Sequence, residues 1–179
     1  MAGSHPRVAT VADAESINEI YNYYVRASAA TFQVDDETTE ERVEELRTRP
    51  DNQPMIVLED KGEIVGWGAL SPFRSRCAYR DTIELTVYVR HDCHRNGYGR
   101  IIVRDLIDRA RSLGYHAVLG VSCTESVGSI ALLKSLGFDI AGTLHEVGSK
   151  FGRRLDVVYL QLMLAASPLS AEETKRGEA

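Results

Sequence analysis

The chain is 179 residues long, of which 44% are hydrophobic and 26% are charged, and its formal net charge is −5. These proportions predict one globular domain that buries a sizeable core. Proteins that bind nucleic acid usually carry a basic excess, so the acidic balance predicts no nucleic-acid partner. The sequence contains neither a visible signal peptide nor an apolar run of the roughly 18 residues that a membrane helix needs, so we expect no membrane association.

The first half of the chain predicts a strand, two helices and a hairpin. Asp13 is placed to cap the first helix, and Thr38 with Glu41 forms a capping box at the start of the second. The expected elements, in order, are a strand at 7–11, a helix that ends before the polar loop 28–37, a helix that ends near 49, and strands at 55–59 and 63–70, joined by a turn at 60–62.

The central stretch, residues 83–106, predicts a strand, a glycine-containing loop and a helix. Apolar and polar residues alternate in 83–90 with the period of a strand. From Ile102 onward, apolar residues recur at three- and four-residue spacing, which is typical of a helix lying on a sheet. The loop therefore lies at the point where that helix must begin.

This loop contains two glycines, Gly97 and Gly99, flanked by Arg95 and Arg100. The first N–H groups of a helix have no intrahelical partner, and glycine lets the backbone approach a ligand closely. A phosphate or pyrophosphate is therefore the expected ligand, with the two arginines as further hydrogen-bond donors. The alternative is an ordinary turn that happens to contain glycines. The sequence has no Walker A loop, and it lacks the third glycine of a dinucleotide-binding fingerprint.

The remainder of the chain continues the alternation of strands and helices. Its expected elements are a helix that ends at Gly114, a strand at 116–122, a helix at 126–136, and strands at 138–146 and 155–164 with a loop at 148–154 between them. This order predicts a mixed sheet with helices on both faces. Residues 1–6 are expected to be an N-terminal extension, and 165–179 a frayed polar tail.

The three cysteines, Cys77, Cys93 and Cys123, are odd in number and far apart. Their spacing matches neither a zinc site nor a disulfide framework. We therefore expect no metal, and a location in the reducing cytoplasm.

Val87-Tyr-Val-Arg90 followed by Arg95-Asn-Gly-Tyr-Gly-Arg100 resembles the acyl-CoA pyrophosphate loop of the GCN5-related N-acetyltransferase (GNAT) superfamily. The wider chain resembles the phosphinothricin and methionine sulfoximine acetyltransferase branch. The matching positions extend over about 7–164 and are Thr31-Phe32, Arg76, Tyr79, Glu84, 86–89, Ser129-Ile130, Leu136-Gly-Phe138, Val147-Gly148, Lys150-Phe-Gly152 and Asp156-Val157. The resemblance implies a mixed α/β fold, a single GNAT-like domain over 7–164, with a central mixed sheet of about seven strands flanked by about four helices.

The resemblance also implies acetyl-CoA as the cosubstrate. Main-chain groups near Val87 to Val89 would pair with its pantetheine arm like an extra strand. The implied acetyl-CoA-binding residues are Val87, Tyr88, Val89, Arg95, Asn96, Gly97, Tyr98, Gly99, Arg100, Ser126 and Ser129. The implied residues for the acceptor are Phe32, Arg76, Tyr79 and Lys150. The residues alone favour a core position at a helix end for Phe32, and a solvent-facing loop for Arg76 and Tyr79.

An acceptor ammonium must lose a proton before it attacks a thioester, and Glu84 is the candidate base. A glutamate inside an apolar strand is costly unless it is solvated or paired. The alternative reading is an outward-facing residue, or an ion pair with the arginines of 74–80.

The chain departs from the family pattern at three positions. Leu133 stands where the phosphinothricin enzymes have a histidine, Ser126 stands for an asparagine, and His94 stands for Gln or Arg. Leucine cannot protonate the departing thiolate, although Tyr88 or Tyr98 could substitute. A thiol pKa of about 8.5 makes the thiolate a tolerable leaving group without an acid.

The implied function is transfer of acetyl to the primary amine of a small amino acid or amino-acid-like toxin. The alternatives are a different amine, such as a protein N-terminus or a polyamine, and a non-catalytic relative that binds acyl-CoA. The long apolar strands at the end of the chain also suggest a homodimer, because an exposed apolar edge favours pairing.

Overall fold

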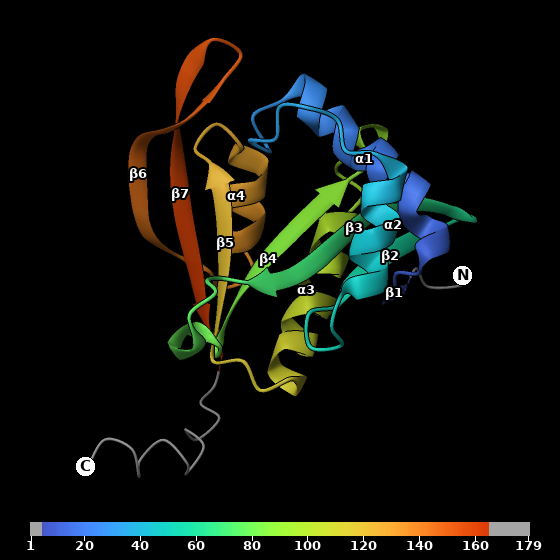
Figure 1. The fold of residues 1–179 in the computed structure, drawn as a ribbon. Helices are drawn as coiled ribbons and strands as arrows, with labels where there is room; N and C mark the ends of the chain where they lie inside the picture. The colour runs from blue at the N-terminus through green and yellow to red at the C-terminus, as the bar shows by residue number, and fades with distance from the viewer. Residues whose placement is uncertain (1–4, 165–179) are drawn as a thin grey trace.

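The computed structural model describes residues 5–164, and these contain one seven-stranded mixed sheet (Figure 1). Its strand order is β1-β2-β3-β4-β5-β7-β6, and the pairing of β4 with β5 is the parallel one among them. The strands are β1 Pro6–Val8, β2 Met55–Asp60, β3 Glu63–Pro72, β4 Thr82–Val89, β5 Ala117–Cys123, β6 Asp139–Lys150 and β7 Arg153–Met163. The expected mixed sheet of about seven strands is confirmed.

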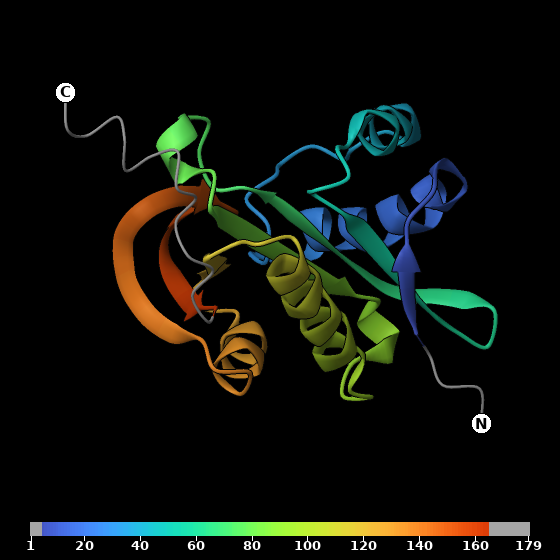
Figure 2. The ribbon, with the colours of Figure 1, turned by 90° about the horizontal axis from the view of Figure 1, so that it is seen from below.

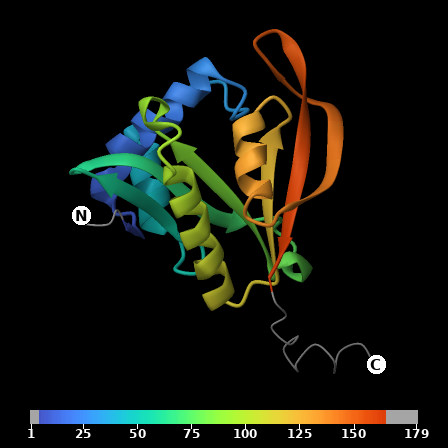
Figure 3. The ribbon, with the colours of Figure 1, turned by 180° about the vertical axis from the view of Figure 1, so that it is seen from behind.

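Within the described residues, four α-helices cover the two faces of this sheet. They are α1 Ala14–Ala27, α2 Thr39–Thr48, α3 Tyr98–Ser112 and α4 Val127–Lys134, and three short 3-10 turns lie at Val11–Asp13, Cys77–Tyr79 and His91–Cys93. Figure 2 shows α1 and α2 on one face and α3 and α4 on the other. In Figure 3, which shows the molecule from behind, α3 and α4 lie in front of the sheet. None of the helices within 5–164 combines the length and apolarity that crossing a membrane requires.

The alternation of β4 divides its side chains between two cores. Ile83 and Leu85 pack with the apolar face of α3, including Ile102 and Leu106, in the larger core. The intervening positions face α1, where Tyr88 packs beside a smaller core formed by Ile17, Ile20, Met55, Val57, Trp67 and Ala69. Glu84 is an even number of positions from Tyr88 in the strand, so its side chain lies on the same face of the sheet as that of Tyr88.

Of the two helix N-caps that the sequence predicts, the structure contains one. The capping box of Thr38 and Glu41 begins α2 as expected. Asp13, however, makes no side-chain capping bond to α1. Its carboxylate instead accepts hydrogen bonds from the Arg7 guanidinium at 2.7 and 2.8 Å and from the Thr10 amide at 2.7 Å. The predicted cap is therefore wrong, because an arginine on the neighbouring strand takes the carboxylate.

The expected loop at 148–154 is also wrong. Both final strands continue through it and pair up to Lys150 and Arg153, so the turn is confined to Phe151 and Gly152. Both turn residues have positive φ, as a tight hairpin turn requires. The register of β6 against β7 also shifts between Leu144 and Gly148, so the strand is irregular shortly before this turn. The predicted tail at 165–179 lies outside the described residues, as does most of the extension at 1–6.

Candidate functional site

The middle of the sheet opens between its two parallel strands. The pairing of β4 with β5 ends at Leu85 and Gly120. Beyond these residues β4 continues to Val89 paired with β3 alone, and β5 continues to Cys123 paired with β7 alone. The two ribbons diverge towards α1 in Figure 1. Main-chain groups on both sides of this opening therefore have no strand partner among residues 5–164.

The amides that face the opening can be assigned by alternation. In an antiparallel pair, the residues that exchange hydrogen bonds with the neighbouring strand alternate with residues that face the other way. The Arg90 amide donates to the Val65 carbonyl of β3 at 2.8 Å. By that register, the N–H and C=O groups of Val87 and Val89 face the opening. The Val89 carbonyl already accepts a hydrogen bond from the Tyr24 hydroxyl at 2.5 Å, so Val87 supplies the open pair.

The loop between β4 and α3 presents a helix N-terminus next to this opening. Gly97 immediately precedes α3 with a φ of 82°, a left-handed conformation that favours glycine. The amides of Arg100 and Ile101 both donate to the Gly97 carbonyl at 3.0 and 3.2 Å. The amides of Tyr98 and Gly99 precede the first intrahelical bonds, so they are the donors that a helix start offers to an anion.

Side chains of the loop are anchored more than the sequence suggested. The Tyr98 hydroxyl donates to Asp60 at 2.9 Å, and Arg100 donates to the Ser135 hydroxyl at 2.7 Å. Asn96 donates to the Cys93 carbonyl at 3.2 Å. Arg95 is exposed and has a φ of 66°. Of the two predicted arginine donors, Arg100 is thus engaged with α4, and Arg95 is the more available.

Gly99 has a different physical role from Gly97. A Cβ at Gly99 would lie 3.0 Å from the Leu132 side chain of α4, whereas a Cβ at Gly97 would meet nothing within 4 Å. The second glycine therefore lets α3 approach α4, and the first provides the turn.

Glu84 is half-buried on the face that carries α1, between Ser71 of β3 and Leu119 of β5. No residue of 5–164 makes a hydrogen bond or an ion pair with its carboxylate, so the expected alternative of a pair with the 74–80 arginines is not found. Burial raises the pKa of Glu84 above its ordinary value. A partly desolvated, unpaired carboxylate has the protonation behaviour that a general base needs.

Two of the predicted acceptor residues lie together at the end of β6. The buried Lys150 ammonium donates to the carbonyls of Ser28 at 2.9 Å and Thr31 at 2.8 Å, and burial lowers its pKa. The Phe32 ring lies so close to Gly148 that a Cβ there would be 2.6 Å away. Both contacts hold the loop after α1 against the final hairpin, and one of the three ammonium protons of Lys150 remains.

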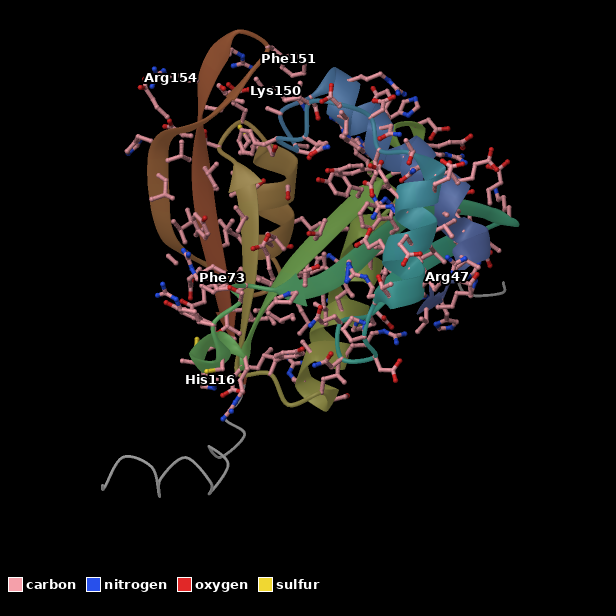
Figure 4. All side chains as sticks on the ribbon, in the orientation of Figure 1. Arg47, Phe73, His116, Lys150, Phe151 and Arg154 are labelled. Carbon is pink, nitrogen blue, oxygen red and sulfur yellow. The ribbon has the colours of Figure 1, made fainter. Side chains whose placement is uncertain are left out.

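Arg76 and Tyr79 are not brought to that place. Both are exposed: Arg76 immediately precedes the short 3-10 turn before β4, and Tyr79 lies in that turn, where its ring is edge-on to that of Phe73 with centroids 5.6 Å apart. Figure 4 labels Phe73 and Lys150 well apart on the molecule. In one copy of the chain, the predicted acceptor residues therefore form two separate groups.

The residues predicted on α4 border the opening from the other face. Ser126 is the residue before the helix, and Ser129 lies in its first turn; both are half-buried. Leu133 is only 3% exposed, and a Cβ at Gly120 of β5 would lie 2.5 Å from it. Leu133 is thus sealed into the core above a glycine that makes room for it.

Neither tyrosine that the sequence suggested as a replacement acid has a free hydroxyl. The Tyr88 hydroxyl donates to the Ala30 carbonyl at 3.3 Å, and burial raises its pKa. The Tyr98 hydroxyl is bound to Asp60, which raises its pKa. Both groups therefore hold their protons in existing bonds.

Sequence reasoning missed a contact between α1 and the glycine loop at this site. The Tyr24 hydroxyl of α1 lies 2.6 Å from Nε2 of His94, the residue that opens the glycine loop. The sequence placed Tyr24 on the apolar face of its helix, and no local pattern connects residues 70 positions apart. The one available signal was His94 itself, as a departure from the family pattern.

Two other features of the described chain lie away from this opening. A surface hollow of about 560 Å³ is lined by residues of β1, α2, β2 and the end of α3, and it contains none of the predicted site residues. Within 5–164, no three His, Cys, Asp or Glu side chains are grouped so that they would hold a metal ion.

Comparison with known proteins agrees with this geometry. Residues 7–159 match the model of the acetyltransferase (GNAT) domain family. The chain is 36% identical over 160 residues to the L-amino acid N-acyltransferase MnaT of Escherichia coli strain K12, covering 88% of this chain and 92% of that protein. The identity is also 36% to an L-methionine sulfoximine/L-methionine sulfone acetyltransferase of Salmonella typhimurium, with 88% and 93% covered.

A solved structure shows the same architecture with a ligand present. The crystal structure of a GNAT superfamily phosphinothricin acetyltransferase from Sinorhizobium meliloti, in complex with acetyl-CoA, has a TM-score of 0.88 at 30% identity and covers 94% of each chain. Since the family match, the identity to curated relatives and the split sheet all agree, the chain belongs to the GNAT family of N-acetyltransferases.

Proposed function

We propose that this enzyme transfers an acetyl group from acetyl-CoA to the primary amine of a free amino acid or an amino-acid-like toxin. The observation that carries the proposal is the opening between β4 and β5, which ends beside the N-terminus of α3. An extended pantetheine arm pairs with the Val87 main chain in that opening, and its pyrophosphate receives the amides of Tyr98 and Gly99. The exposed Arg95 adds charge there.

The reaction itself requires little of the side chains. Glu84 accepts a proton from the acceptor ammonium, directly or through a water, and the neutral amine attacks the thioester carbonyl. The Val87 amide donates to the developing oxyanion. The C–N bond forms, the attacking nitrogen releases its second proton to solvent, the C–S bond breaks, and CoA leaves as a thiolate that takes a proton from solvent. Leu133 is sealed in the core and has no proton to give, so position 133 does not supply an acid.

The amino-acid class of acceptor is supported by the activities in the names of the relatives and by the groups that lie at the end of β6. The free proton of the Lys150 ammonium is a donor for a carboxylate, and Phe32 supplies apolar surface beside it. Arg76 and Tyr79 stay in the proposal as the carboxylate partners that the family resemblance implies. Their separation from Lys150 makes them the weaker half of the predicted acceptor set.

A thiol-release assay with acetyl-CoA tests this function. The amine panel contains L-methionine, methionine sulfoximine, methionine sulfone, phosphinothricin, spermidine and a short peptide with a free N-terminus. The proposal predicts thiol release with one or more of the first four and little with the last two. Release with spermidine or the peptide alone would assign a different acceptor. Acetyl-CoA binding without release on any amine would indicate a non-catalytic relative.

We also propose that the protein works as a homodimer in the cytoplasm. The edge strand β6 exposes large apolar side chains, and a second copy is the partner that would cover them. The apolar residues exposed on β6 and at its turn are Ile140, Leu144, Val147 and Phe151.

A further inference from the structure

One hydroxyl joins the end of the central strand to the start of the glycine loop. The Tyr24 hydroxyl lies 2.5 Å from the Val89 carbonyl, the last of β4, and 2.6 Å from Nε2 of His94. Nε2 itself is 3.3 Å from the same carbonyl. Three polar atoms from three segments of the chain thus meet at one point beside the opening.

The protons at this point can be counted. A carbonyl oxygen only accepts, and the tyrosine supplies one proton. If Tyr24 donated to His94, the short contact between the Tyr24 and Val89 oxygens would hold no proton. Every contact is satisfied when Tyr24 donates to Val89 and Nε2–H of His94 donates to the Tyr24 oxygen. Burial raises the pKa of Tyr24 to about 12, so its hydroxyl keeps this proton at neutral pH.

The same helix holds the turn between these two residues. The ring of Tyr23 stacks on His91 with centroids 4.0 Å apart and planes 10° from parallel. The Tyr24 ring also packs on Tyr88 with centroids 5.3 Å apart. The C-terminal end of α1 is therefore in contact with both the strand and the 3-10 turn that leads into the loop.

This arrangement has two consequences for an acyl donor bound as proposed above. The Tyr24 hydroxyl already donates a hydrogen bond to the Val89 carbonyl. The main chain of β4 that stays open to acetyl-CoA is therefore a short segment centred on Val87. The arrangement also fixes the first residue of the loop relative to that strand, which sets the distance between the groups for the thioester and those for the pyrophosphate. A preset site binds its ligand more tightly because less order must be acquired on binding.

We propose that Tyr24 and His94 are positioning residues that preset the acetyl-CoA site through their shared hydrogen bonds to each other and to Val89. The proposal rests on the proposed function, since it concerns the binding of the same donor. It assigns a specific role to a histidine that departs from the family pattern. The role needs the Nε2–H donor, and a glutamine amide, with the same number of bonds from Cβ, can supply it as well.

Acetyl-CoA titration by calorimetry, on the full chain, tests the proposal. Tyr24→Phe and His94→Ala should each raise the acetyl-CoA Kd by about three- to tenfold, as expected for the loss of one hydrogen bond. The double variant should be little worse than either single one, because both remove the same unit. His94→Gln should return the Kd to within about twofold of the natural chain. Tyr23→Phe, which keeps its stacked ring, is the matched control.

Two further readouts separate positioning from folding and from failure of the proposed function. The effect of Tyr24→Phe should fall on KM for acetyl-CoA and not on kcat, and ¹⁵N NMR should find the Nε2–H tautomer of His94 in the natural chain. Equal Kd values for the natural chain and Tyr24→Phe, or additive single effects, would overturn the proposal alone. A natural chain that binds no acetyl-CoA would overturn the proposed function as well.

Discussion

At the scale of single residues, Glu84 is the side chain that we propose as the general base of the site. Its carboxylate is half-buried and unpaired among the described residues, and burial raises its pKa. The ionised form is therefore disfavoured in the folded state. The pKa of Glu84 is therefore higher in the folded chain than its ordinary value of 4.5 in the unfolded chain. The stability that this group contributes falls as the pH rises from 4.5 through the folded pKa. Such a destabilising charge is typical of a functional position rather than a structural one.

Glu84→Gln should lower kcat/KM about 100-fold or more at neutral pH, because the acceptor ammonium then loses its base. The loss should shrink at high pH, where the amine is already neutral. The thermal stability of the variant at neutral pH should equal or exceed that of the natural chain, because a buried charge is removed. pH–rate profiles and thermal melts provide the measurement.

The control for this substitution is Glu15→Gln, which changes an exposed glutamate at the start of α1. It should alter neither the pH–rate profile nor the melting temperature. A Glu84→Gln profile with the same shape and height as that of the natural chain would remove Glu84 from the role of base.

At the scale of elements, the start of α3 provides the sharpest test of the glycine loop. Gly97 has a φ of 82° and open space around its missing Cβ. Gly97→Val should therefore strain the turn by about 1–2 kcal/mol without a clash in the core. We expect it to abolish measurable acetyl-CoA binding, while the circular dichroism spectrum stays that of the folded chain.

Gly114 provides a matched control at the other end of the same helix. It has a φ of 83° and likewise meets nothing within 4 Å, so Gly114→Val carries the same backbone strain. This variant should lose a similar amount of stability and keep its affinity for acetyl-CoA. Equal affinity in the two variants would mean that the Gly97 loop does not form the binding site.

The contact of β1 with the start of α1 makes a pH-dependent contribution to stability. Hydrogen bonds from Arg7 lower the pKa of Asp13 from 3.8 to about 2. Because the folded pKa is depressed, this contribution is present above pH 4 and is lost as the pH falls towards 2. Asp13→Asn should cost about 1–2 kcal/mol at pH 7 and progressively less below pH 4, measured by urea unfolding.

Asp108→Asn is the matched control, because the pair of Asp108 with Arg111 lies on the exposed surface of α3. Its cost should stay within about 0.5 kcal/mol at either pH. A cost for Asp13→Asn that did not change between pH 7 and pH 2.5 would show that charge is not its cause.

The strengths and limits of sequence reasoning are clearest in individual elements. Alternation in 83–90 and the stripe from Ile102 predicted β4 and α3, because β4 divides its side chains between two cores and α3 buries one regular face. The loop at 148–154 was misassigned because β6 is exposed almost throughout, so burial imposes no alternation on it. Its pairing with β7 stabilises it instead, and pairing leaves little trace in the sequence of one strand.

The candidate site divides in the same way. Gly97 and Glu84 could be found because a turn and a charged residue in a strand are local anomalies. The partners of Tyr98, Arg100 and Lys150 could not, since they are distant carboxylate, hydroxyl and carbonyl groups brought close only by the fold.

At the scale of the whole molecule, the exposed edge of the sheet predicts self-association. Sedimentation equilibrium should give about twice the 19.9 kDa mass of one chain. Replacing Ile140 and Leu144 of β6 by lysine should shift the mass to that of a monomer, because two charges would then face the apolar surface of the partner. Val34→Lys, at an exposed position in the loop after α1, should leave the mass unchanged. A natural chain that sediments as a monomer would refute the dimer.

The shape of the whole sheet supports one central claim, that a thioester coenzyme lies between β4 and β5 and ends on the N-terminus of α3. A crystal structure of the chain grown with acetyl-CoA tests this claim most directly. We predict the pantetheine arm beside Val87 and the pyrophosphate within hydrogen-bonding distance of the amides of Tyr98 and Gly99. Acetyl-CoA bound at any other surface, with the opening occupied by water alone, would contradict the account.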